Sequence, residues 1–205
     1  TLADSTQAIA LSIQAACAVM GCPAPSLDAA RHVIGLGLHE AMACLVPGLP
    51  RGDYEQMIQR YRAHWLPRDP QVALFPGSVA MLAQLAERGH MLAIATGKSS
   101  AGLRRALHAT GVADFFAATR CADQCASKPA PDMLQELMHE LATLPEHTLM
   151  VGDTTHDLQM ARHAGVDALA ICHGAHARDN LAALEPLACL DDTAQLAQWL
   201  QSRAA

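Results

Sequence analysis

Residues 148–157 read TLMVGDTTHD and combine the end of a predicted strand with the start of a predicted helix. Residues 148–151 are typical of a short buried strand, and a glycine and Asp153 follow them directly. A second aspartate, Asp157, comes four positions later and begins a helix that we predict over residues 157–164. A strand that ends in polar residues and leads straight into a helix is typical of one strand–helix unit of a parallel sheet.

The same alternation of strand and helix extends in both directions along the chain. Further strands are predicted at residues 90–95, 117–121, 168–172 and, at an edge, 188–190. Further helices are predicted at residues 78–88, 100–110, 131–141 and 193–202. Such alternation implies right-handed crossovers and a parallel sheet with helices on both faces. The sequence therefore predicts a doubly wound α/β fold.

The first seventy residues have a different character, because their apolar residues follow helical spacing only. We predict helices at residues 5–20, 26–35, 38–46 and 53–65, with Ser26 and Asp53 as caps, and Ser78 as the cap of the helix that follows. The character changes at residues 74–77, Leu-Phe-Pro-Gly. We therefore expect a helical cap domain over residues 6–74, inserted into an α/β core made of residues 1–5 and 75–205.

Composition limits the partners and the compartment. The chain has 205 residues, of which 51% are hydrophobic and 17% charged, so a compact globular protein is expected. A net charge of −6 gives no general attraction to nucleic acid or to an anionic membrane, and no apolar run approaches a membrane span of ~20 residues. Seven cysteines without a CxxC pair indicate reduced thiols, hence a cytoplasmic protein. The CxxxC spacing of Cys121 and Cys125 lacks a second ligand pair for zinc.

Ligands of doubly wound sheets bind at the carboxyl ends of the strands. The strand at residues 90–95 ends in Thr96-Gly97-Lys98-Ser99, where a hydroxyl and free backbone N–H groups open onto a helix. This is a natural cradle for phosphate, although Thr96 or Ser99 alone would be read as a helix cap.

Two more loops place charges at strand ends. Lys128, one of only two lysines, precedes a proline that stiffens its loop, and a compact ammonium suits a phosphoryl group. Asp153 and Asp157 offer hard oxygen ligands that suit Mg²⁺. The alternative is that either aspartate only caps the next helix, and His156 is interpreted as an ordinary loop histidine.

Together these pieces resemble the haloacid dehalogenase superfamily, and in particular its phosphoglycolate phosphatase-like members. The first motif of that family reads Asp-x-Asp-Gly-Thr-Leu-x-Asp-Ser, and this chain opens with Thr-Leu-Ala-Asp-Ser. The second motif matches at Thr96, the third at Lys128, and the fourth at Asp153 and Asp157. Ile-Gly-Leu-Gly-Leu at 34–38 and Phe-Pro-Gly at 75–77 are also similar to these phosphatases.

The resemblance implies a Rossmann-like core and a Mg²⁺-dependent phosphatase that works through a phosphoaspartyl intermediate. Thr96, with Gly97 and Lys98, would hold the phosphoryl oxygens, and Lys128 would orient the nucleophile. Asp153 would ligate Mg²⁺, with Asp157 as a second ligand or as support. The best single guess for the substrate is 2-phosphoglycolate.

Arg31 and His32 are the candidates within the cap to meet a substrate carboxylate, although both also fit an ordinary helix surface.

Both aspartates of the first motif would fall immediately before Thr1, together with the central strand that carries them. The first would be the nucleophile and the second the general acid and base. We therefore expect roughly ten to twenty residues upstream, about a strand and its lead-in, and no turnover from a chain that begins at Thr1.

Two other functions remain open. A sugar-phosphate mutase of the same superfamily shares all the core residues. A non-catalytic, regulatory protein that binds phosphate would use the same pocket. A dehalogenase is disfavoured by the carboxylate pair, and a phosphonatase by the absence of lysine from residues 5–75. The expected partner is a small phosphate ester, and the expected assembly is a monomer or a homodimer.

Overall fold

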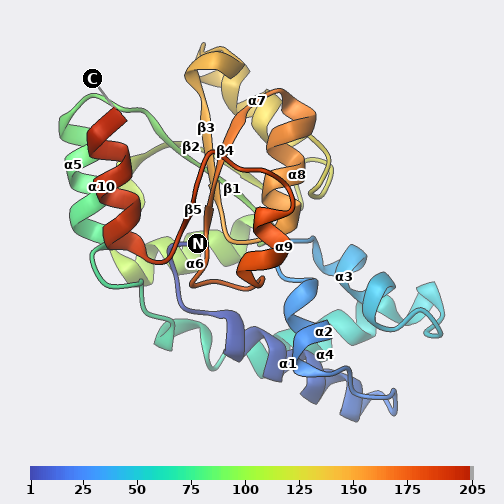
Figure 1. Ribbon diagram of the computed structural model, residues 1–205. Coiled ribbons are helices and arrows are strands. Elements are labelled where there is room, and N and C mark those ends of the chain that lie inside the picture. The colour runs from blue at the N-terminus through green and yellow to red at the C-terminus, as the bar shows by residue number, and fades with distance from the viewer. Residues whose placement is uncertain (204–205) are drawn as a thin grey trace.

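The computed structural model describes residues 1–203. Figure 1 shows an α/β body that holds all the strands, and a separate group of helices, α1–α4, beside the lower edge of that body. The N-terminus lies beside Asp153 at the carboxyl end of β3, and the chain enters the helical group soon afterwards.

Within residues 1–203, five strands form the body, each within two residues of its predicted bounds. They are β1 (Leu92–Thr96), β2 (Phe116–Cys121), β3 (Leu149–Gly152), β4 (Asp167–Ile171) and β5 (Cys189–Leu190). Every pairing among them is parallel. The predicted α/β class with a parallel sheet is confirmed.

The strands form two sheets where one was expected. One sheet has the order β1-β2 and the other β3-β4-β5. Between them lies a cavity of about 1470 Å³, lined by Ala93 and Ala95 of β1 and by Leu149 and Val151 of β3. Among residues 1–203, β1 and β3 each keep one edge without a strand partner, so backbone hydrogen-bonding groups face this space.

Helices cover the sheets on both faces, as predicted. On one face, α5 (Ser78–Glu87) and α10 (Thr193–Arg203) place Met81 and Leu196 against β4. On the other, α7 (Asp132–Glu140) and α8 (Thr155–Ala164) place Met133 and Met160 in a second cluster. Helix α6 (Ser100–Thr110) was also predicted. Helix α9 (Arg178–Ala182) was not predicted. A five-residue helix is too short to show helical periodicity in the sequence.

The group of helices before the core has its own hydrophobic interior. It contains α1 (Thr6–Val19), α2 (Leu27–His32), α3 (Leu38–Leu45) and α4 (Tyr54–Trp65). Their buried side chains form a single cluster that includes Ile13, Met42, Met57 and Ile58. This agrees with the expected division into a cap at 6–74 and a core at 1–5 and 75–205, which stays a prediction. Residues 204–205 lie outside the described part.

The chain enters and leaves the helical group through adjacent segments. Ala3 and Leu74 form an antiparallel bridge. The Asp4 N–H donates to the Ala73 carbonyl at 2.9 Å, and the Phe75 N–H donates to the Leu2 carbonyl at 2.9 Å. Two adjacent extended segments, one on each side of the helical group, therefore join it to the core.

Three expected helix starts need correction. Gly77, with φ +84°, is the N-cap of α5, so Ser78 lies inside the helix. Asp53 precedes α4 without a capping side-chain hydrogen bond. Helix α8 begins at Thr155 and is capped by Thr154, so Asp157 belongs to its first turn. Ser26 caps α2 as predicted, accepting from the Ala29 N–H at 3.1 Å.

Within residues 1–203, none of the helices combines the length and the apolar character that crossing a membrane requires.

Candidate active site at the strand ends

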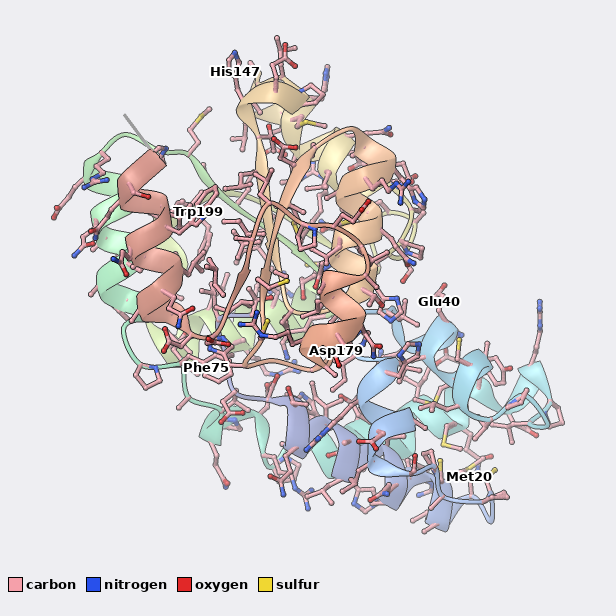
Figure 2. All side chains as sticks on the ribbon, viewed as in Figure 1. Met20, Glu40, Phe75, His147, Asp179 and Trp199 are labelled. Atoms are coloured by element: carbon pink, nitrogen blue, oxygen red, sulfur yellow. The ribbon has the colours of Figure 1, made fainter. Side chains whose placement is uncertain are left out.

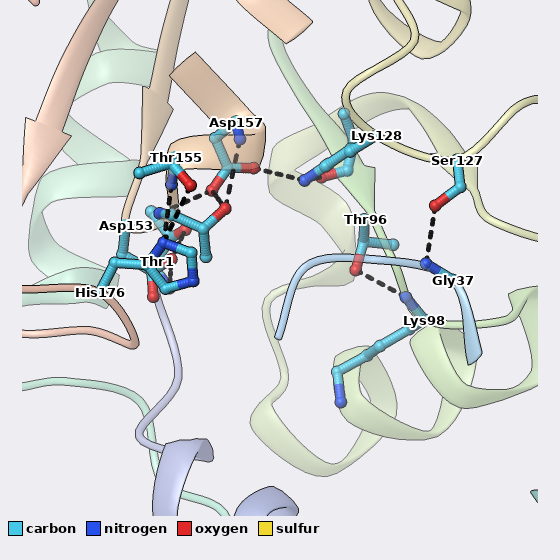
Figure 3. A network of polar contacts seen from close by, with 12 residues as sticks. Thr1, Gly37, Thr96, Lys98, Ser127, Lys128, Asp153, Thr155, Asp157 and His176 are labelled. Carbon is cyan, nitrogen blue, oxygen red and sulfur yellow. Dashed lines mark hydrogen bonds and ion pairs between the residues drawn. The ribbon is translucent and has the colours of Figure 1, made fainter. Parts of the chain in front are cut away.

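All six predicted site residues of the core line the same cavity. Thr96 ends β1, and Asp153 follows β3 directly. Lys128 lies in the loop between β2 and α7, and Asp157 in the first turn of α8. Gly97 and Lys98, beside Thr96, line the cavity as well. Figure 3 shows Lys128 extended toward Asp157, with Asp153 and Thr96 on neighbouring segments. Because parallel strands carry their carboxyl ends to one edge of a sheet, residues distant in sequence meet here.

Lys128 is held in one position. It is 5% exposed. Its Nζ donates to Asp157 Oδ1 at 2.5 Å and to the Ala95 carbonyl at 2.9 Å. The lysine therefore brings a fixed positive charge to the end of β1, where its carbonyl partner lies next to Thr96 in sequence.

Asp157 uses both carboxylate oxygens within the protein. Oδ1 accepts from Lys128, and Oδ2 accepts from the Thr154 N–H at 3.0 Å and from the Thr154 hydroxyl at 2.8 Å. In return, the Asp157 N–H donates to Thr154 Oγ1 at 3.2 Å, which completes a capping box. With both oxygens engaged, Asp157 is better placed to position Lys128 than to ligate a metal. Its role as a ligand stays a prediction.

Asp153 has one oxygen held by the core and one directed at Thr1. Oδ2 accepts from the Ala175 N–H at 2.8 Å. Oδ1 lies 2.6 Å from the Thr1 amino nitrogen and accepts from the Thr1 hydroxyl at 2.5 Å. Burial alone raises the pKa of Asp153, but the Thr1 ammonium and these hydrogen bonds outweigh it and hold the pKa well below its usual range. Wherever a residue precedes Thr1, that nitrogen is an uncharged amide donor.

The surroundings of Asp153 fit a hard divalent cation. Asp153 lines the cavity, its Oδ2 is fixed by the Ala175 N–H, and a carboxylate oxygen is a ligand that Mg²⁺ prefers. Among residues 1–203, no group of three or more histidine, cysteine, aspartate or glutamate side chains forms a metal site. Mg²⁺ is compatible with this because it is usually bound through one or two carboxylates and keeps water and phosphate oxygens as its other ligands.

A loop of the helical group lies across the strand ends. A Cβ on Gly97 would fall 2.5 Å from the carbonyl oxygens of Gly35 and Leu36, so only glycine permits this approach. The Gly37 N–H donates to the hydroxyl of Ser127, next to Lys128, at 2.7 Å (Figure 3). The loop at residues 35–37 therefore closes one side of the site.

Three histidines form a second contact between the helical group and the core. His32 stacks on His176 with ring centroids 5.0 Å apart, and His156 meets both rings edge-on. His156 Nε2 and His176 Nε2 lie 2.8 and 3.1 Å from the His32 carbonyl oxygen. Burial lowers the pKa of both His156 and His176. The sequence contains no spacing that would have predicted this cluster.

Arg31 and His32 do not reach the cavity. Neither is among the residues that line it. Arg31 Nε is buried without a hydrogen-bond partner among residues 1–203, and the His32 ring is engaged with His176. A contact between either side chain and a substrate carboxylate stays a prediction without support from the geometry.

Comparison with known proteins identifies the family. The family model described as haloacid dehalogenase-like hydrolase matches residues 1–171. The chain belongs to this family. The recognition made from four short motifs is confirmed, and so is the expectation of an enzyme.

Two similar proteins carry names that include a function. The probable phosphatase IndB of Dickeya dadantii is 36% identical over 198 residues, which cover 93% of this chain and 85% of IndB. A phosphoglycolate phosphatase of Rhodospirillum rubrum is 35% identical over 175 residues, which cover 81% of this chain and 72% of the relative. The prediction of a hydrolase similar to phosphoglycolate phosphatases agrees with both.

The fold has a close counterpart among solved structures. The crystal structure of a predicted phosphoglycolate phosphatase from Haemophilus somnus matches with a TM-score of 0.87, covering 98% of this chain and 94% of that one. At 23% sequence identity, this likeness concerns the fold alone.

Proposed function

We propose that this protein is a Mg²⁺-dependent phosphatase that hydrolyses a small phosphate monoester through a phosphoaspartyl intermediate. One observation carries the proposal: Thr96, Lys128 and Asp153, from three separate loops, line one cavity at the strand ends. A hydroxyl, a fixed cation and a carboxylate in one partly enclosed space suit phosphoryl transfer, which depends on positioning and charge neutralisation.

In this proposal Thr96 and the N–H groups of its loop hold the oxygens of the phosphoryl group. The turn is compact, because the Lys98 N–H donates to Thr96 Oγ1 at 3.2 Å. Lys128 offsets the negative charge on the nucleophile and phosphoryl group. Because Asp157 and the Ala95 carbonyl hold its Nζ, the charge needs no rearrangement at the moment of reaction.

Asp153 would hold Mg²⁺ through Oδ1, with Asp157 as support for Lys128. When bound, the ion would neutralise phosphoryl charge and align the phosphorus with its nucleophile. Oδ2, tied to the Ala175 N–H, keeps the carboxylate oriented.

The nucleophile and the general acid belong, in this proposal, to a strand upstream of Thr1. Three features support this placement. Strands β1 and β3 each have a free edge among the described residues, a cavity of about 1470 Å³ separates them, and the Thr1 nitrogen lies 2.6 Å from Asp153 Oδ1. Residues directly before Thr1 would therefore lie at the carboxylate that we assign to the metal.

The substrate is proposed to be small and anionic, with 2-phosphoglycolate as the best candidate. Support comes from the helical loop at residues 35–37, which crosses the strand ends and limits the space for a leaving group. The name of the Rhodospirillum rubrum relative points the same way. We also propose a cytoplasmic protein that acts as a monomer or homodimer.

The test uses full-length protein, including the residues upstream of Thr1, with para-nitrophenyl phosphate and Mg²⁺. We expect turnover that Asp153→Ala abolishes and that Asp114→Ala leaves unchanged, because Asp114 is exposed and lies outside the cavity. Inert full-length protein that still binds inorganic phosphate would instead establish a non-catalytic binder.

A panel of phosphate esters separates a phosphatase from a sugar-phosphate mutase. The phosphatase releases inorganic phosphate in proportion to substrate consumed. A mutase would convert a sugar phosphate into its isomer without net release of phosphate, and that result would replace the proposal.

A further inference from the structure

Lys98 lines the cavity, and among residues 1–203 its ammonium group has no carboxylate partner. Among residues 1–203, its side chain has neither an ion pair nor a hydrogen bond, and its one close polar contact is the face of Trp65, 4.7 Å from Nζ to the ring centroid. The residue lines the cavity. In Figure 3 its side chain runs from the Thr96 turn away from Lys128.

The contact joins the two parts of the molecule. Lys98 belongs to the loop after β1 in the core, whereas Trp65 ends α4 in the helical group. Trp65 is 5% exposed and stacks on Tyr61, with ring planes 4° apart. The Trp65 ring is therefore packed into the helical group. It occupies only one side of the ammonium, which has three N–H donors.

The carboxylate that acts on Lys98 is itself paired with an arginine. Asp69 is the acidic residue that acts on the Lys98 ammonium. Its Oδ2 is already paired with Arg105 Nε at 3.0 Å. Arg62 of α4 also lines the cavity. Burial disfavours the charged form of Lys98 and lowers its pKa. An anion beside Nζ would offset part of this desolvation penalty.

We propose that Lys98, backed by Trp65, binds a carboxylate on the leaving group and so selects phosphate esters that carry a second negative charge. This inference rests on the proposed function, because it takes the Thr96 turn as the site of the transferred phosphoryl group. The backbone of Lys98 is part of that turn, so its side chain starts beside the proposed phosphoryl site.

The sequence suggested Arg31 as the contact for a substrate carboxylate, but Arg31 lies outside the cavity. The geometry assigns this contact to Lys98 instead. A lone ammonium matches one carboxylate because each contributes a single charge. A second phosphate carries more charge and more acceptor oxygens than one lysine satisfies.

Two non-hydrolysable ligands test the inference on full-length protein with Mg²⁺. Phosphonoacetate and methylphosphonate share the phosphonate, and only the first has a carboxylate. By titration calorimetry we expect phosphonoacetate to bind about tenfold more tightly, as for one charged hydrogen-bonded contact. In Lys98→Met, which keeps an apolar stem against Trp65, the two ligands should bind equally. Arg104→Met removes an exposed cation on α6, the helix that follows the Lys98 loop, outside the cavity, and should keep the tenfold preference.

Catalysis gives a second readout. For Lys98→Met, the ratio of kcat/KM for 2-phosphoglycolate to that for para-nitrophenyl phosphate should fall about tenfold, mainly through KM. Equal losses for both substrates, or no loss, would show that Lys98 only ties the helical group to the core and would overturn the inference. A preference in binding that depends on Lys98, in a protein without turnover, would uphold the inference while the proposed phosphatase failed.

Discussion

The chain contains two lysines, and the structure treats them in opposite ways. Lys128 is buried and fixed by Asp157 and the Ala95 carbonyl. Lys98 is half-buried and rests on the face of Trp65, without an anionic partner among residues 1–203. Both line the same cavity. In the functions proposed above, the first charge would serve a step common to every substrate, and the second would bind a group that only some substrates carry.

The two arrangements also differ in what they cost the fold. A buried ion pair such as Lys128–Asp157 adds little net stability, but removal of one partner leaves an uncompensated charge. A cation over an aromatic ring stabilises by about 0.5–1 kcal/mol at exposed sites, and more when desolvated. Removal of Lys98 therefore leaves no buried carboxylate unpaired.

The largest expected effect is that of Lys128→Met. We expect kcat to fall about 10³-fold, since one preorganised electrostatic contact is lost, and the free energy of unfolding to drop by about 3–5 kcal/mol, since Asp157 remains buried. Phosphate release and urea unfolding measure the two effects. The double variant Lys128→Met/Asp157→Asn should regain most of the stability and none of the activity. Wild-type stability in the single variant would contradict the fixed ion pair.

A smaller effect distinguishes the proposed metal ligand, Asp153, from Asp157, which we propose only positions Lys128. In Asp153→Asn, the Mg²⁺ concentration for half-maximal activity should rise at least about tenfold, because a ligand charge is removed. In Asp157→Asn, kcat should fall, but the Mg²⁺ requirement should stay within about threefold, because both oxygens of Asp157 serve Lys128 and Thr154. A Mg²⁺ titration of phosphate release measures both. Equal shifts in the two variants would make Asp157 a ligand.

The smallest effect concerns the contact between the helical group and the Asp157 loop. Burial lowers the pKa of His156 and His176 in the folded protein. In the unfolded chain these histidines keep an ordinary pKa of about 6.5, so they are protonated at a higher pH there than in the folded protein. The free energy of unfolding is therefore highest above about pH 6.5 and decreases as the pH falls below it. The thermal midpoint should decrease from about pH 7.5 to about pH 5.5. His176→Gln should make this decrease smaller, and an unchanged slope would remove these histidines from the explanation.

The sequence predicted the strands and most helices because their signals are local. The apolar run that ends at Asp153 and the helical spacing of residues 6–65 need no tertiary information. The motif residues Thr96, Lys128 and Asp153 were also found, since strand ends are where such sheets bind ligands. The helix start at Asp157 was misplaced because its side chain turns back to Thr154, and a capping box is read correctly only when its cap residue is known.

The roles of individual charges depended on contacts between distant segments. The pairing of Lys128 with Asp157 joins residues 29 positions apart, and His156 meets the His32 carbonyl across 124 positions. Arg31 and Lys98 illustrate the same limit, because both are cations near motif residues and only the second lines the cavity.

By itself, the amino-acid sequence determined the class of fold, the family and the set of polar residues at the strand ends, because short-range patterns encode them. Only the tertiary structure decided which of those residues are already paired and which face the cavity with unmet charge. The physical reason is that a carboxylate or an ammonium acquires its role from the groups within a few ångströms of it, and chain folding, not sequence spacing, selects those neighbours.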